Sequence, residues 1–332
     1  MLIYLRKETY ANESRTPLVP VHIEILKKAG FHILVESSEK RIFSDTDFIK
    51  AGAIITNEPW FNQPSETLIV GLKELSNLDK LNAHTHIYFS HSYKQQNNAN
   101  QILQAFKRSN SIIYDLEYFL NPDGQRALAF GYHAGLVAAA LGLTQHCNRQ
   151  TGKPDLHNLQ PWLTMDSMLD SCKIYPATIA VVGCGRTAKG VKYILRKFGY
   201  NPLSISRENI FQIKDADIIF NCITLEKNYN DVWIDKDTQL NKDQLIVDIS
   251  CDYAKPNNPI AVYLSPTTWE KPVFNYSDKL SIIAIDNLPS LLPRDSSVEF
   301  SEKLADLLLR YGDSCWHNNL KKFQNATAYW KK

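Results

Sequence analysis

Residues 178–190 read T-I-A-V-V-G-C-G-R-T-A-K-G and constrain the fold of this chain more than any other stretch. A β-branched run stops at a G-x-G-x-x-A turn, and Val191, Ile194 and Leu195 follow at helical spacing before Gly199. This pattern predicts a strand, a tight turn and a helix in succession. Such a unit belongs to α/β folds with a parallel sheet.

The turn itself suggests dinucleotide binding. Gly183 permits the turn, Gly185 lets the backbone approach a pyrophosphate, and Ala188 lets the helix pack on the strand. The N–H groups of the new helix, with Arg186 and Thr187 in its first turn, would face the phosphates. A bare glycine motif is also compatible with a merely tight strand-to-helix turn, so its flanking strand and helix carry the hypothesis.

Composition narrows the class of protein. A chain of 332 residues with 44% hydrophobic content can form two domains. Its net charge of +2 includes no basic run, which argues against nucleic acid or an anionic membrane as partner and leaves small charged metabolites. The six cysteines form no C-x-x-C, which predicts reduced, buried thiols in a cytosolic protein.

Two apolar stretches have the features of neither a leader nor a membrane span. The sequence is charged by Arg6, too early for a signal peptide, and the apolar run 136–143 is too short to cross a bilayer. We therefore expect a cytoplasmic protein with no membrane partner.

The first part of the chain alternates strand and helix patterns. We expect strands at 2–5, 32–36, 53–56 and 111–114, with helices at 21–29, 45–51 and 97–107. In 67–74 and 86–94 an apolar strand ends in ionisable residues, and in open α/β sheets ligands bind at strand ends. The alternation predicts a parallel, helix-covered sheet with its chemistry at these two ends.

The pattern changes at Gly131, where a long alanine-rich helix is expected through about residue 146. After the glycine turn, strands at 202–206, 217–223, 245–249 and 281–285 would complete a dinucleotide-type sheet. An amphipathic helix at 293–311 is expected to return to the first domain. The interpretation is two Rossmann-like α/β domains, 1–130 plus 294–332 for substrate and 131–293 for the dinucleotide, with the active site in the cleft between them.

Lys73 and His91 are the best candidates for acid/base chemistry, because each follows an apolar strand and both side chains can exchange protons near neutral pH. On position alone, a solvated lysine and a hydrogen-bonded structural histidine remain the simpler interpretations. His84 and His86 share a strand face with His91 nearby, but no cysteine or carboxylate completes a metal shell, so no metal is expected.

Four further charged residues are candidates with simpler alternatives. Arg15 and Arg126 can clamp carboxylates through paired hydrogen bonds, or form ordinary ion pairs. Glu74 and Glu117 can set the charge state of a neighbouring lysine or histidine, or remain solvated.

The motifs around these residues resemble those of the saccharopine dehydrogenases that form L-lysine, relatives of alanine dehydrogenase. The resemblance runs in order along nearly the whole chain. It is carried by G-L-K-E at 71–74, H-I-Y-F-S-H-S-Y-K-Q-Q at 86–96, Y-D-L-E at 114–117, A-F-G-Y-H-A-G at 129–135, F-N-C-I at 220–223, V-D-I-S at 247–250 and I-D-N-L-P-S-L-L-P-R at 285–294.

The resemblance implies a reversible oxidative cleavage of a secondary amine. In this family a hydride passes from the glutamate α-carbon of saccharopine to the nicotinamide of NAD or NADP, the imine takes up water, and lysine and 2-oxoglutarate leave. Lys73 and His91 match the family's acid/base pair, and Glu74 and Glu117 match acidic residues that tune it. Arg15 and Arg126 match substrate-carboxylate positions, and Asp286, Asn287 and Leu288 match a segment beside the nicotinamide.

Departures from the family keep alternatives open. The family usually has two adjacent arginines where this chain has Gln125 and Arg126, so a different second acid is conceivable, as in other amino-acid or opine-type dehydrogenases. Ser206 stands where an NAD-binding fold carries an acidic residue, and Arg207 beside it suits a 2′-phosphate. A non-catalytic dinucleotide sensor is the alternative of another class, and the expected assembly is a monomer or small homo-oligomer.

Overall fold

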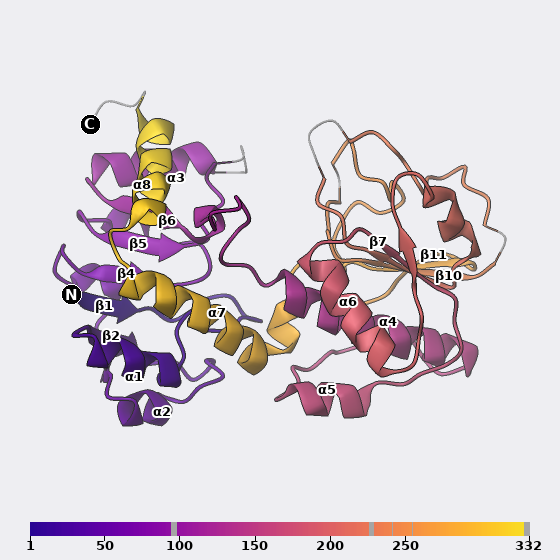
Figure 1. Ribbon diagram of the computed structural model, residues 1–332, viewed down its shortest axis with the longest axis horizontal. Coiled ribbons are helices and arrows are strands. Elements are labelled where there is room, and N and C mark those ends of the chain that lie inside the picture. The colour runs from indigo at the N-terminus through magenta and orange to yellow at the C-terminus, as the bar shows by residue number, and fades with distance from the viewer. Residues whose placement is uncertain (94–97, 226–228, 241, 254, 329–332) are drawn as a thin grey trace. The chain divides into compact units, whose positions relative to one another are not determined.

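The computed structural model describes residues 1–93, 98–225, 229–240, 242–253 and 255–328. The chain divides into two compact units: unit 1 comprises Met1–Ala129 and Pro293–Lys332, and unit 2 comprises Phe130–Leu292. Each unit is built on its own sheet of six strands (Figure 1). None of the described helices is long and apolar enough to cross a membrane.

The sheet of unit 1 is parallel throughout, in the order β3-β2-β1-β4-β5-β6. Its inner strands are short and mostly buried, as expected for a parallel sheet covered by helices, whereas the edge strand β3 is partly exposed. The elements are β1 (Leu2–Leu5), α1 (Pro20–Lys28), β2 (His32–Glu36), α2 (Asp45–Lys50), β3 (Ile54–Thr56), β4 (Leu68–Val70), β5 (Thr85–Tyr88), α3 (Ala99–Arg108), β6 (Ile112–Asp115), α7 (Pro293–Leu309) and α8 (Ser314–Thr327).

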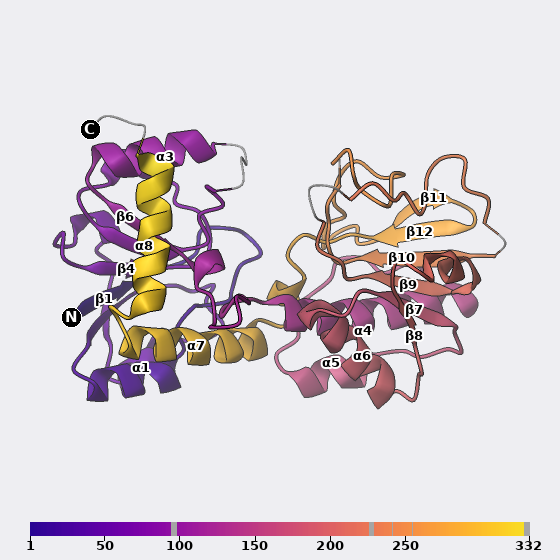
Figure 2. The same cartoon turned by 45° about the horizontal axis from the view of Figure 1, so that its top comes forward.

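The C-terminal helices complete unit 1. Two fully buried serines of α7 accept hydrogen bonds from the backbone before α1: Ser297 Oγ from Thr16 at 3.0 Å and Ser301 Oγ from Val19 at 2.9 Å. Helix α8 contacts α3, which runs across its upper end in Figure 2, and Phe323 enters the same apolar cluster as Phe106. The helix expected at 293–311 is therefore α7, whereas α8 was not predicted.

The sheet of unit 2 has the order β11-β12-β10-β9-β7-β8 and is parallel except for the edge strand β11, which pairs antiparallel with β12. Its elements are α4 (Gly131–Gln150), α5 (Met165–Ser171), β7 (Ile179–Val182), α6 (Arg186–Lys197), β8 (Leu203–Ile205), β9 (Ile218–Asn221), β10 (Gln244–Asp248), β11 (Phe274–Ser277) and β12 (Leu280–Ile283). The α/β class and both mostly parallel sheets are as predicted.

Glycines fix the crossing of α4 and α6, the closest helix contact in unit 2. A Cβ on Gly135 would lie 2.1 Å from the carbonyl oxygen of Thr187, and one on Gly190 would lie 2.1 Å from that of Tyr132. Neither position has room for a side chain, because backbone meets backbone at both. The two helices cover one face of the sheet, and loops with the short 3-10 helix Ile210–Asp215 cover the other (Figure 2).

Candidate active site

Lys73 and His91 come from neighbouring strands of unit 1. Strands β4 and β5 pair in parallel, and the pairing continues past their ends, where the Phe89 N–H donates to the Leu72 carbonyl at 3.0 Å. Lys73 and His91 each lie three residues beyond their strand. The structure therefore brings both predicted acid/base residues to the same edge of the sheet.

Two buried residues that follow β1 hold the backbone at Lys73. The Glu8 carboxylate accepts the N–H of Leu72 at 2.7 Å and that of Lys73 at 2.9 Å, and the Arg6 guanidinium donates to the Lys73 carbonyl. Arg6 and Glu8 are 4% and 8% exposed and lie 3.6 Å apart as an ion pair. The Lys73 backbone is thus held at its N–H by Glu8 and at its carbonyl by Arg6.

Gly71 makes this grip possible. A Cβ at that position would lie 2.1 Å from Arg6 Nε, so no larger residue fits while the guanidinium keeps its place. Arg6 and Glu8 were missed by the sequence reasoning, although they follow the apolar strand 2–5 in the same way that Lys73 follows its own. The expectation that functional residues follow the carboxyl ends of strands would have marked both as candidates.

Tyr10 links the charged groups around Lys73. Its ring centroid lies 5.7 Å from Lys73 Nζ, and its hydroxyl donates to Glu74 Oε2 at 2.5 Å. This hydrogen bond and burial raise the pKa of Tyr10 to about 12, so the hydroxyl stays protonated at neutral pH. The other carboxylate oxygen of Glu74 lies 3.9 Å from His91 Nε2. Glu74 therefore lies between the Tyr10 hydroxyl and the His91 imidazole.

The backbone of His91 adopts φ +51°, a left-handed conformation that is uncommon for a residue with a side chain. Its neighbours hold it there. Ser90 donates to Asp115 Oδ2 at 2.5 Å, and the Phe89 ring stacks on the imidazole at 6.3 Å. Burial raises the pKa of Asp115 above its usual range, and its backbone is bonded twice to Asn319 of α8.

The predicted arginines both have acidic partners. Arg126, whose side chain is 44% exposed, forms an ion pair with Glu117, which in turn follows Asp115 at the end of β6. Arg15 is 4% exposed, and its guanidinium donates to both oxygens of Glu13, at 2.8 and 2.6 Å. Arg126 thus reaches solvent beside the strand ends, whereas Arg15 lies in a buried fork.

The histidines considered for a metal site have different surroundings. His84 and His86 are buried in an aromatic cluster, with the Trp60 ring 5.8 and 4.9 Å away. Burial holds the pKa of His86 well below its usual range. Over the part of the chain that the structure describes, no three His, Cys, Asp or Glu side chains form a metal cluster. Lys94, Gln95 and Gln96, at the end of the motif 86–96, lie outside the described residues.

In unit 2 the glycine turn has the form that the motif predicts. Gly183 has φ +106°, and a Cβ there would lie 3.2 Å from the Cys222 carbonyl oxygen. Gly185 caps the start of α6, and apart from Gly185 itself and its two chain neighbours, no described atom lies within 4 Å of the place where its Cβ would be. That space lies at the helix N-terminus, where N–H groups favour an anion. The turn therefore fits a dinucleotide pyrophosphate.

One expectation at this turn was wrong. Cys184 is exposed rather than buried, because it projects from the turn between two glycines, and Cys172, Cys251 and Cys315 are only partly buried. In the first turn of α6, Ala188 is fully buried, as expected for the small residue that lets the helix pack closely. Thr187 packs against Gly131 and Gly135. Arg186, the first residue of the helix, is half-buried.

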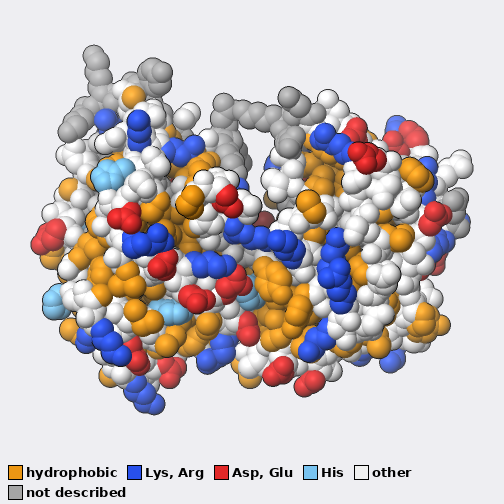
Figure 3. All heavy atoms as spheres, in the orientation of Figure 1, with side chains coloured by type: hydrophobic (Ala, Val, Ile, Leu, Met, Phe, Trp, Pro, Cys, Tyr) orange, Lys and Arg blue, Asp and Glu red, His pale blue; other side chains and the backbone are white. Residues whose placement is uncertain are grey.

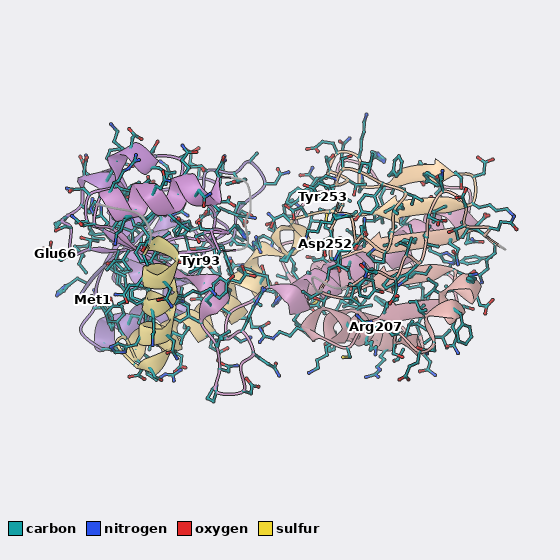
Figure 4. All side chains as sticks on the ribbon, turned by 90° about the horizontal axis from the view of Figure 1, so that it is seen from above. Met1, Glu66, Tyr93, Arg207, Asp252 and Tyr253 are labelled. Carbon is teal, nitrogen blue, oxygen red and sulfur yellow. The ribbon has the colours of Figure 1, made fainter. Side chains whose placement is uncertain are left out.

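A cavity of about 400 Å³ opens at the ends of β7 and β8. Ser206 and Arg207 line it with Tyr229 and Trp233. The Ser206 hydroxyl donates to Asn209, and Arg207 (labelled in Figure 4) lies over the Tyr229 ring at 5.1 Å. Asp231 approaches Arg207 Nε at 3.8 Å, although both side chains are more than half exposed. The cavity has the place and size of a nucleotide pocket.

Two further strand ends border this edge of the unit 2 sheet. After β12, Asp286 is exposed, Asn287 donates to Ser290 Oγ at 2.6 Å, and Leu288 is buried at the start of a 3-10 helix. At the end of β10, burial raises the pKa of Asp248 to about 6. Its carboxylate accepts hydrogen bonds from Asn221, Tyr263 and the Cys251 N–H.

Known proteins are similar to this chain over most of its length. Residues 4–137 match the family described as alanine dehydrogenase/PNT, N-terminal domain. The "Saccharopine dehydrogenase [NAD(+), L-lysine-forming]" of Yarrowia lipolytica is 36% identical, over 93% of this chain and 91% of the relative. The chain belongs to the saccharopine dehydrogenase (L-lysine-forming) family. Relatives of the same name from Neurospora crassa and Candida glabrata are each 34% identical, over 96% and 98% of this chain and 92% and 97% of theirs.

Solved structures agree with the fold of this family. An L-alanine dehydrogenase superposes with a TM-score of 0.73 at 16% identity, covering 99% of both chains. A transhydrogenase from Sinorhizobium meliloti superposes with a TM-score of 0.74 at 13% identity, covering 96% of this chain and 97% of its own. At these identities the likeness confirms the fold alone, and the roles of the individual site residues stay predictions.

Proposed function

We propose that this protein is an NAD-dependent saccharopine dehydrogenase, which cleaves saccharopine to L-lysine and 2-oxoglutarate and can run in reverse. The observation that carries the proposal is the acid/base cluster of unit 1, in which Lys73 and His91 follow paired strands. The names of the family relatives agree with this reaction. When bound at the glycine turn, the dinucleotide supplies the acceptor for the substrate's hydride.

Lys73 and His91 are proposed to move the protons of the reaction. Cleavage needs a proton removed from the secondary amine, a base to activate water against the imine, and an acid to protonate the leaving lysine nitrogen. Glu74, with a carboxylate oxygen 3.9 Å from His91 Nε2, is proposed to contribute to the electrostatics of this pair. Glu8 and Arg6 are proposed to act as positioning residues, because both form hydrogen bonds with the Lys73 backbone.

The substrate's carboxylates are proposed to bind through Arg126 and Arg15. Arg126 is the more exposed member of its pair with Glu117, so its guanidinium can be reached by a substrate carboxylate. Arg15 is buried, and its guanidinium donates to both carboxylate oxygens of Glu13. To bind a substrate carboxylate, the Arg15 guanidinium must therefore share these donors with Glu13 or release Glu13. Glu117 is proposed to tune the charges of the cluster.

NAD is proposed as the cofactor. The relatives carry NAD(+) in their names, and the Asp231 carboxylate beside Arg207 partly offsets the cation that would attract a 2′-phosphate. Both side chains are exposed, so this offset is small. Ser206 offers a hydroxyl to the ribose in place of the usual carboxylate.

The reaction is tested by incubating the protein with saccharopine and NAD, following NADH by absorbance, and identifying the products by mass spectrometry. We expect lysine and 2-oxoglutarate in equal amounts with NADH. Oxidation of NADH with another amine and oxo acid pair, but not with lysine and 2-oxoglutarate, would refute the substrate and point to a related dehydrogenase, in line with Gln125 beside Arg126. Dinucleotide binding without oxidation of any tested substrate would indicate the non-catalytic sensor.

A further inference from the structure

The carboxylate of Asp115 lies at the end of β6 and reaches the segments that carry His91 and Glu117. Acidic and basic side chains are intermixed on the surface of unit 1 seen in Figure 3, whereas Asp115 is 0% exposed. Taking a carboxylate out of water is costly unless hydrogen bonds replace the lost hydration. The two oxygens of Asp115 therefore need partners, and each of them has one.

Each oxygen of this carboxylate holds a different segment. Oδ2 accepts a hydrogen bond from the Ser90 hydroxyl at 2.5 Å, and Ser90 directly precedes His91. Oδ1 accepts the N–H of Glu117 at 2.9 Å. The paired register of β5 and β6 ends at Tyr88 and Asp115, so the carboxylate links the two segments beyond the last paired residues of these strands.

The segment from Ser90 to Ser92 forms a closed turn with His91 at its centre. Ser90 Oγ accepts the Ser92 N–H at 3.3 Å, and the Ser92 hydroxyl donates to the Ser90 carbonyl at 3.1 Å. Both serines are buried. The φ of His91, +51°, is one that a residue with a side chain keeps only where its surroundings enforce it. The Ser90 hydroxyl connects this turn to Asp115.

Helix α8, yellow in Figures 1 and 2, holds the strand end from which Asp115 projects. Asn319 Oδ1 accepts the Asp115 N–H at 3.0 Å, and Asn319 Nδ2 donates to the Asp115 carbonyl at 2.8 Å. The Trp316 ring lies 4.9 Å from that of Tyr114 and 4.7 Å from that of Phe119, on either side of Asp115 in sequence. These buried contacts fix the backbone of Asp115 against the C-terminal helix.

We propose that Asp115 is a positioning residue for the reaction and acts through Ser90 to hold His91 in its left-handed conformation. The inference rests on the proposed function, because His91 is there a proposed proton carrier. By accepting the Glu117 N–H, the same carboxylate fixes the start of the segment that bears Glu117. Such support matters for catalysis, since a displacement of about 1 Å in a reacting group can lower a rate about 100-fold.

The kinetic test uses Ser90→Ala, which removes the hydroxyl between the turn and Asp115. We expect kcat with saccharopine to fall about tenfold, with KM and NADH affinity within about twofold of the parent, because a displaced proton carrier impairs the chemical step. Asp115→Asn, which keeps only one acceptor oxygen, should cause a loss of the same order. Ser111→Ala, a buried serine before the other end of β6, is the matched control and should keep the parent's kcat.

Two further readouts separate positioning from a general loss of stability. In a His91→Gln background, Ser90→Ala should change kcat by less than about twofold, because the residue that it positions is already absent. Without any substrate, the modification of His91 by diethyl pyrocarbonate, followed by peptide mass spectrometry, should be about threefold faster in Ser90→Ala, since the turn relaxes without its support. His32, exposed on β2, should react at an unchanged rate.

The outcomes distinguish this inference from the proposed function. Parent-like kcat or parent-like His91 reactivity in both Ser90→Ala and Asp115→Asn would overturn the inference and leave the proposed reaction in place. An equal loss of kcat from Ser90→Ala in the parent and in the His91→Gln background would also overturn it, because the network would then act on the fold in general. If the parent does not oxidise saccharopine, the proposed function fails, and the reactivity of His91 decides whether Asp115 and Ser90 hold that residue.

Discussion

At the carboxyl edge of the unit 1 sheet, the charged side chains are paired with one another, whereas at the same edge of the unit 2 sheet glycines, hydroxyls and one buried carboxylate predominate. Unit 1 has the pairs Arg6–Glu8, Glu74–His91 and Glu117–Arg126. Unit 2 has open space at Gly185 and a cavity beside Ser206. We propose that the same strand-end position serves proton transfer in one unit and close backbone approach to a dinucleotide in the other.

The largest effect is expected at the charged edge. His91→Gln removes a proposed proton carrier and should lower kcat by about 10²- to 10³-fold, with little change in dinucleotide affinity. Steady-state kinetics with saccharopine and fluorescence titration with NADH measure the two quantities. His32→Gln, at an exposed position on β2, is the control. A proportional loss of dinucleotide affinity would contradict the division of roles between the units.

Two glycine substitutions separate folding from binding in unit 2. Gly190→Ala forces a methyl group into the Tyr132 carbonyl and should destabilise unit 2 by about 3 kcal/mol. Gly185→Ala has an ordinary φ of −70° and open space, so it should leave stability nearly unchanged and weaken NADH binding tenfold or more. Hydrogen exchange by unit and NADH titration test this pair. If Gly185→Ala bound NADH normally, the space beside it would not hold the phosphates.

Two buried groups, one in each unit, are expected to make contributions to stability with opposite pH dependence. The pKa of His86 is depressed on folding, so its contribution to stability is present above pH 6.5 and is lost as pH falls. The pKa of Asp248 is raised to about 6, so its contribution is present below about pH 4 and is lost as pH rises through 6. Each proton linkage reaches about 1.4 kcal/mol per pH unit.

Matched variants isolate these linkages. The free energy of unfolding of the parent minus that of His86→Phe should decrease as the pH falls from 7 to 5. The free energy of unfolding of the parent minus that of Asp248→Asn should decrease as the pH rises from 4 to 6. Urea unfolding followed by hydrogen exchange in each unit provides the values. Parallel slopes for the two variants would refute the contrast.

The smallest effect is expected at Arg207. Because Asp231 partly offsets its charge, Arg207→Ala should weaken NADPH binding about threefold and leave NADH binding nearly unchanged. Titration of both nucleotides against parent and variant tests this. A parent that prefers NADPH would overturn the proposed cofactor.

Sequence alone predicted the strand ends that bear Lys73 and His91, because apolar runs stopping at ionisable residues are local signals. It did not reveal Arg6 and Glu8 as their supports, since β1 lies beside β4 only through the sheet order, and Glu8 is 65 residues from Lys73. The Gly183 turn was predicted for the same local reason. Strand β11 was missed because its residues are exposed on an edge and carry no buried pattern.

The partners of charged side chains were also not predictable from the sequence. Arg15 was predicted as a substrate contact, and nothing local showed that Glu13, two residues away, would take both sides of its guanidinium fork. Cys184 was expected to be buried because most cysteines without a disulfide are. In the glycine turn the Cys184 side chain is exposed to solvent, contrary to this tendency.

The most direct test of the central claim is Lys73→Met, measured for kcat with saccharopine and for NADH affinity in the same preparation. Lys80→Met, an exposed lysine nearby in sequence, is the control. We expect kcat to fall about 10³-fold while NADH affinity stays within about twofold, because proton transfer belongs to unit 1 and dinucleotide binding to unit 2. Unchanged kcat in Lys73→Met would contradict the claim.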